Sequence, residues 1–70
     1  MPEFEVAIYN EEVREKVRSG SWHRDLNDDW AEIHYIEVKA KDENDANQQI
    51  LRKYPKNQGY VIESVIKVQF

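Results

Sequence analysis

The fold depends on one stretch of sequence, Ser21-Trp22-His23-Arg24-Asp25-Leu26-Asn27-Asp28-Asp29-Trp30-Ala31-Glu32. Its first half, residues 21–26, can form a short strand that ends in a polar turn at residues 27–29. The whole stretch can instead be a loop that is anchored by its tryptophans. We favour the strand, which makes the sheet four-stranded.

The segments on either side of this stretch show strand and helix patterns in turn. Apolar residues recur at every second position in residues 3–9, 33–41 and 60–70, which is the period of a strand. Residues 10–20 begin at a capping asparagine and end at a glycine, and residues 42–54 begin at a capping aspartate and end before a proline. These segments are expected to form helices.

The resulting order, β-α-(β)-β-α-β, predicts an α+β fold. With residues 21–26 as a strand, it is the ferredoxin-like (split βαβ, βαββαβ) arrangement, an antiparallel-rich sheet with both helices on one face. Without them, it is a three-stranded β-α-β-α-β sheet with a long loop over residues 20–32. The expected core contains Phe4, Val6, Ile8, Val13, Val17, Ile36, Val38, Ala46, Ile50, Ile62, Ile66 and Val68.

Length and composition predict one small acidic domain over residues 1–70. The chain has 70 residues, 40% of them hydrophobic, and a net charge of −4, which is enough apolar material for a modest core. There is no cysteine, which excludes disulfides and thiolate chemistry. The acidic N-terminal residues do not resemble a signal peptide, and no apolar run approaches the ~20 residues of a membrane span. We expect a cytoplasmic protein that does not enter membranes.

Candidate chemical sites are incomplete. Asp25, Asn27 and Asp29 match the first ligands of a calcium loop, but Trp30 replaces the required glycine and Ile36 the required glutamate. No serine has an evident base and oxyanion hole, and no phosphate-binding loop is present. We therefore expect no metal and no cofactor, and an enzyme is the less favoured class. The remaining ligand-binding or catalytic hypothesis needs His23, Asp25, His34 and Tyr35 to converge on one pocket.

Nucleic-acid binding is also disfavoured. Residues 33–40 lack the glycine and spaced aromatics of an RNA-binding sheet. The net charge of −4 opposes a phosphate backbone, so we expect no binding to RNA or DNA.

The most informative pattern is apolar residues on the sheet face away from the helices. In the last strand, Tyr60, Ile62, Ser64, Ile66 and Val68 are expected to face the core, which leaves Val61 and Val65 outward. The candidate partner-binding residues are Tyr9, Ile33, Tyr35, Val61 and Val65. They favour a non-enzymatic interaction module that dimerises or docks to a larger protein partner through this face. In the alternative interpretation, Trp22, Trp30 and their loop fold back and cover the face.

Overall fold

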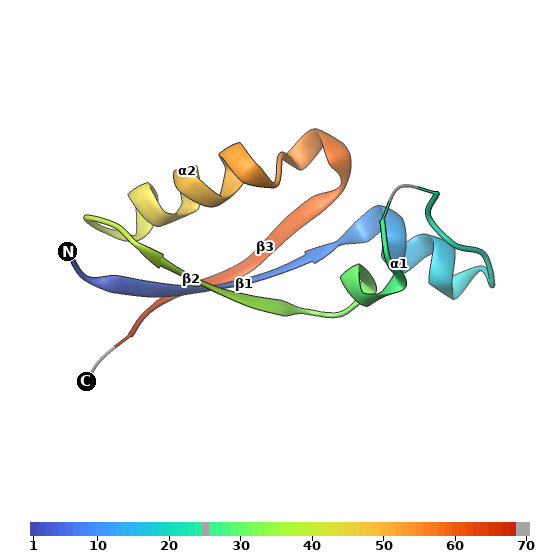
Figure 1. Ribbon diagram of the computed structural model, residues 1–70, viewed down its shortest axis with the longest axis horizontal. Coiled ribbons are helices and arrows are strands. Elements are labelled where there is room, and N and C mark those ends of the chain that lie inside the picture. The colour runs from blue at the N-terminus through green and yellow to red at the C-terminus, as the bar shows by residue number, and fades with distance from the viewer. Residues whose placement is uncertain (25, 69–70) are drawn as a thin grey trace.

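The chain forms an α+β structure in which strands and helices alternate (Figure 1). The computed structural model describes residues 1–24 and 26–68. The elements are β1 (Glu3–Asn10), α1 (Glu11–Arg18), β2 (His34–Lys39), α2 (Glu43–Lys53) and β3 (Tyr60–Lys67). Two short 3-10 helices, Asp28–Ala31 and Lys56–Gln58, precede β2 and β3.

The sheet has three antiparallel strands in the order β2-β1-β3. The described residues of 21–26 form no strand, and Asp25 lies outside the described residues. Instead, the Asn27 side chain accepts a hydrogen bond from the Asp29 N–H and starts the 3-10 helix. The expected fourth strand is therefore wrong for these residues, and the three-stranded alternative describes the sheet.

Helix α2 covers one face of this sheet (Figure 1). Asp42 caps it by accepting a hydrogen bond from the Asp45 N–H at 2.8 Å, because the first N–H groups of a helix have no partner within it. Ala46 and Ile50 are its buried residues. The predicted helix over residues 42–54 is thus confirmed, including the apolar face that packs on the sheet.

Helix α1 lies beyond one end of the sheet, so the expectation of two helices on one face is wrong (Figure 1). Val13 is its one buried residue, and Val17 is 43% exposed. The helix follows directly from β1, and Asn10 ends the strand and caps the helix at once. With no connecting loop, α1 continues past the sheet end, which explains why Val17 does not enter the core as expected.

The main core lies between α2 and the sheet. Its buried residues are Val6, Ile8, Ile50 and Tyr60, with Phe4, Ala40 and Ala46 forming a second cluster beside them. Trp30 packs against the main cluster on this helix-covered side, while Trp22 is 73% exposed. The interpretation in which both tryptophans cover the other face is therefore wrong.

A β-bulge in β3 changes which residues face the core. Ile8 pairs with Ile62, but Ala7 pairs with Ser64, so Glu63 has no partner in the register. Because side chains alternate between faces, one extra residue reverses the faces of everything that follows. Val65 therefore packs against the core instead of pointing outward, and Ile66 is 58% exposed instead of buried.

Candidate functional site

The sheet face opposite α2, here called the open face, is built from rows of side chains that cross the three strands. One row contains Tyr35, Ala7 and Ser64, and the next contains Glu37, Glu5 and Ile66. The flanking positions belong to Glu3 with Lys39 at one end and Tyr9 with Val61 at the other. No helix or strand of the described chain lies over this face (Figure 1).

The middle of the open face combines small side chains with large exposed ones. Ala7 is 5% exposed, whereas Tyr35 is 66% and Ile66 58% exposed. Tyr35 lies on β2 and Ile66 on β3, so the two large exposed side chains stand on either side of the central strand β1. A partner can contact both residues while it approaches the sheet closely over Ala7 and Ser64.

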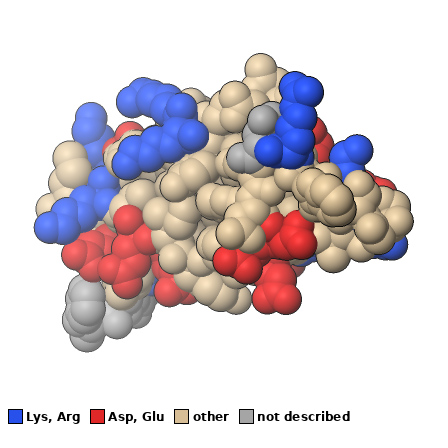
Figure 2. Space-filling view, turned by 45° about the vertical axis from the view of Figure 1, so that its right-hand side comes forward, with Lys and Arg blue, Asp and Glu red and all other residues tan. Residues whose placement is uncertain are grey.

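The open face is also acidic at its centre. Glu5 and Glu37 lie directly opposite each other on β1 and β2, an arrangement that destabilises a sheet when both carry the same charge. Among the described residues, Arg18 forms an ion pair with Glu15, and the His23 ring lies 3.5 Å from a Glu12 carboxylate oxygen. Neither contact involves Glu5 or Glu37. Figure 2 shows that acidic and basic side chains gather on different parts of the visible surface.

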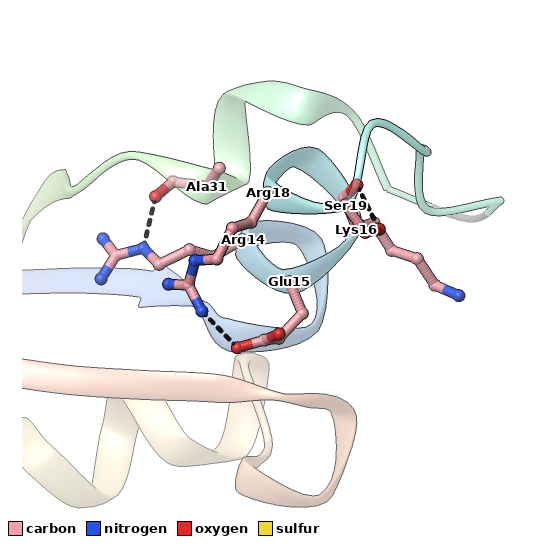
Figure 3. A network of polar contacts seen from close by, with 6 residues as sticks. All are labelled: Arg14, Glu15, Lys16, Arg18, Ser19 and Ala31. Atoms are coloured by element: carbon pink, nitrogen blue, oxygen red, sulfur yellow. Dashed lines mark hydrogen bonds and ion pairs between the residues drawn. The ribbon is translucent and has the colours of Figure 1, made fainter.

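Tyr9, one of the candidate partner-binding residues, contacts a cation from α1. The Arg14 guanidinium lies 3.6 Å from the centre of the Tyr9 ring, which is cation–π geometry. The same guanidinium donates from Nε to the Ala31 carbonyl oxygen at 2.9 Å (Figure 3). Arg14 thus ties the loop before β2 to α1 and places a positive charge at this end of the open face.

Ile33 and Val61 are both half-buried. Val61 pairs with Tyr9, and Ile33 comes immediately before β2. Val61 therefore adds an apolar side chain beside Tyr9 on the open face. Of the five candidate partner-binding residues, Tyr9, Tyr35 and Val61 therefore share this face by register, and Val65 does not.

His34 belongs to the opposite face, where it supports the core. Its ring stacks on Trp30 with centroids 4.3 Å apart, and its Nε2 donates to the Asp29 carbonyl oxygen at 2.9 Å. Trp30 in turn contacts Tyr54 and Tyr60. The histidine is thus held in an aromatic cluster that closes the core where β2 begins.

His23 has a different environment, next to α1. Its Nδ1 accepts a hydrogen bond from the Leu26 N–H at 3.2 Å, so the neutral ring carries its proton on Nε2. That Nε2 lies 3.5 Å from a carboxylate oxygen of Glu12. Two open depressions of about 310 and 430 Å³ adjoin this pair, and both are lined by Glu12 and His23.

The proposed pocket of His23, Asp25, His34 and Tyr35 does not form among the described residues. Tyr35 and His34 are neighbours in a strand, so their side chains point to opposite faces of the sheet. His23 and His34 have separate sets of partners, and Asp25 lies outside the described residues. Residues 1–24 and 26–68 contain no group of three side chains able to hold a metal ion.

Tyr60 is a buried titratable group in the aromatic cluster. Burial, and to a lesser extent the nearby Tyr54, raise its pKa above the usual 10.0, because the phenolate loses its hydration. The folded protein therefore keeps a proton that the unfolded chain releases first. Its contribution to stability is complete below pH 10.0 and decreases as the pH rises through the raised pKa.

We expect the melting temperature to fall as the pH rises from about 9 to 11, and Tyr60→Phe to reduce this fall. Circular dichroism melts of both proteins measure the difference. Tyr35→Phe is the control, because Tyr35 is 66% exposed. An equal reduction in both variants would assign the pH dependence to other groups.

Sequence reasoning missed the exposed Ile66, and Ser64 is the residue that could have revealed it. A strict alternation places this serine among core-facing residues without a hydrogen-bonding partner. A bulge at Glu63 moves the serine to the open face and Val65 to the core. The polar residue at an apolar position was the available signal for the bulge.

Comparison with known proteins identifies no relatives: no family model, curated protein or solved structure matches the chain. No helix in the described part is long and apolar enough to cross a membrane. Functional inference therefore depends on the geometry of the open face.

Proposed function

We propose that the protein is a small non-enzymatic interaction module that binds a basic amphipathic helix of a partner protein on its open face. The observation that carries this proposal is the exposure of Tyr35 and Ile66 beside the opposed pair Glu5 and Glu37. Apolar area supplies the attraction, and the two carboxylates select the charge of the partner.

The dimensions of the open face suit one helix. Three strands at a spacing of ~4.8 Å give a face ~14 Å wide, and a helix with its side chains is ~10 Å in diameter. Helix α2 already occupies the other face in this way. A second helix on the open face would complete a three-layer arrangement in which both sides of the sheet are covered.

The charges favour lysine or arginine on the partner. Glu5 and Glu37 face each other across the β1–β2 pair, so a cation placed between them can form ion pairs with both carboxylates. Tyr35 lies two residues from Glu37 on the same strand, and Ile66 lies directly opposite Glu5. The matching helix therefore carries basic residues beside leucine-like residues on one face.

The test is an NMR titration with a synthetic helix that has leucine on one face and lysine on the other. We expect its binding to shift the amide signals of Tyr35, Glu37 and Ile66, and Glu5→Lys with Glu37→Lys to weaken it at least ~10-fold. A helix of the same pattern with glutamate in place of lysine should not bind.

The matched control is Glu32→Lys with Glu63→Lys, two exposed glutamates whose reversal changes the net charge equally. If both double variants weaken binding to the same extent, net charge alone attracts the peptide and the open face is not its site. Shifts confined to α1 or α2 would reject the proposal in the same way. A dimer that forms without peptide and disappears on Glu5→Lys alone, a change on the central strand and away from both sheet edges, would show that a second copy occupies the face.

A further inference from the structure

The phase of the β1–β2 ladder determines which backbone groups of β2 point outward. The Ala40 N–H donates to the Pro2 carbonyl oxygen at 3.1 Å, and this pair continues the register in which Glu3 faces Lys39. Hydrogen-bonded pairs alternate with non-hydrogen-bonded pairs in an antiparallel ladder. The backbone N–H and C=O groups that point toward β1 are therefore those of His34, Ile36 and Val38. Those that point to the outer edge of β2 belong to Tyr35 and Glu37.

The other side of the sheet agrees with this phase. The Val68 N–H donates to the Glu3 carbonyl oxygen at 2.8 Å, so the odd residues of β1 bond to β3 and the even residues to β2. By the same alternation, the backbone N–H of Val65 points to the outer edge of β3.

The two edges of the sheet differ in how they are protected. The bulge at Glu63 interrupts β3, a feature that discourages another strand from pairing there. Strand β2 has six residues without proline, glycine or a bulge. At its end, the Lys39 carbonyl oxygen already accepts a hydrogen bond from Gln49 Nε2 at 3.0 Å. The part of the β2 edge that can pair with another strand is thus Tyr35 to Glu37.

We propose that β2 pairs antiparallel with β2 of a second copy of this chain, with the two-fold axis at Ile36. Tyr35 of each chain then exchanges both backbone hydrogen bonds with Glu37 of the other. This register uses the outward N–H and C=O groups of both residues, and it joins two three-stranded sheets into one continuous sheet.

Side chains favour Ile36 as the centre of the pairing. A centre at Glu37 would place two carboxylates directly opposite each other, which is destabilising. A centre at Ile36 places Tyr35 opposite Glu37 on the open face and the two Ile36 side chains together on the helix-covered face. Ile36 is half-buried and packs against the main core, so the contact extends that core across the two-fold axis.

Edge pairing does not depend on whether the open face binds a helix. It would nevertheless double the width of that face and place the Tyr35 and Glu37 side chains of both chains next to one another. Once the β2 edge is paired with a second copy, it can no longer pair with strands of unrelated proteins.

Sedimentation equilibrium of the unliganded protein from ~10 µM to ~1 mM tests the proposal, since contacts of this small size give weak dimers. We expect a mass that rises from monomer to dimer. A chemically synthesised chain with an N-methyl amide at Glu37 should raise the dissociation constant at least ~10-fold. The same modification at Val65, on the β3 edge, should leave it unchanged. A monomeric mass throughout, or equal effects of the two N-methyl groups, would overturn edge pairing at β2.

Cysteine cross-linking provides a second measurement that does not need N-methylation. The chain has no native cysteine, and Cα atoms of a non-hydrogen-bonded antiparallel pair are ~4.5 Å apart, within disulfide range. In a glutathione redox buffer, Ile36→Cys should form a covalent dimer faster than Val65→Cys, a matched β-branched position on the other edge strand. Equal rates would overturn the register.

Normal binding of the helix peptide by a monomeric protein would reject edge pairing while supporting the open-face proposal.

Discussion

Replacement of Trp30 by alanine is expected to lower the free energy of unfolding by ~3 kcal/mol, near the lower end of values for large aromatic residues. Trp30 stacks on His34 and contacts Tyr54 and Tyr60 at centroid distances of 5.4 and 5.1 Å. Its removal leaves a cavity between the loop before β2 and the end of α2. A 70-residue domain has a total stability of roughly 4–10 kcal/mol, so the loss is a large fraction.

Trp22→Ala is the matched control, because Trp22 is 73% exposed and its loss should change stability by less than ~0.5 kcal/mol. Urea denaturation followed by far-UV circular dichroism compares the variants without depending on tryptophan fluorescence. Similar losses for both would mean that the aromatic cluster does not connect the loop to the core.

The contrast between these two tryptophans shows what local sequence could predict. Both occur in the same polar stretch, and nothing in their neighbouring residues distinguishes them. The partners of Trp30 come from residues 34, 54 and 60, which are brought together by the fold. Long-range contacts of this kind do not follow from periodicity, and for the same reason the strand that we favoured for residues 21–26 was wrong for the described residues.

Local patterns did predict the strands and helices on either side of residues 21–32. Asn10 and Asp42 begin helices as capping residues, and the alternation in residues 33–41 corresponds to β2. The errors arose where a regular strand or helix period was assumed to continue unchanged. Val65 and Ile66 were assigned to the wrong faces because the bulge between them and Ile62 changes the phase. Val17 was assigned to the core on helical spacing, although α1 passes the end of the sheet.

The sequence also predicted only some of the features of the open face. Tyr35 lies on the open face in the expected way, because the β1–β2 pairing is regular throughout. The opposition of Glu5 and Glu37 depends on the register between two strands that are far apart in sequence. The Arg14 contact with Tyr9 depends on the direction in which α1 leaves β1. Neither of these features could be read from one segment alone.

Replacement of Gly59 by alanine is expected to lower the free energy of unfolding by ~2–5 kcal/mol. Gly59 has a φ of +94°, where an L-residue costs ~1–2 kcal/mol. An added Cβ would lie 2.7 Å from Glu12 Cγ and 2.8 Å from Asn10 Oδ1. Asn10 is 0% exposed, accepts from the Val13 N–H and donates to the Gln58 carbonyl oxygen. Displacing it would break buried hydrogen bonds, which adds ~1–3 kcal/mol.

Gly20→Ala separates the backbone contribution from the steric one. Gly20 also has a positive φ, of +78°, but an added Cβ there would meet no atom within 4 Å. Its replacement should therefore cost only the ~1–2 kcal/mol of the left-handed backbone. Denaturant midpoints of the two variants, at a shared m-value, measure the difference. A larger loss for Gly59→Ala locates the extra energy in the junction where Asn10 ends β1, caps α1 and holds the turn before β3. Equal losses would show that Asn10 and Glu12 move aside at little cost, and that this junction does not depend on close packing against the glycine.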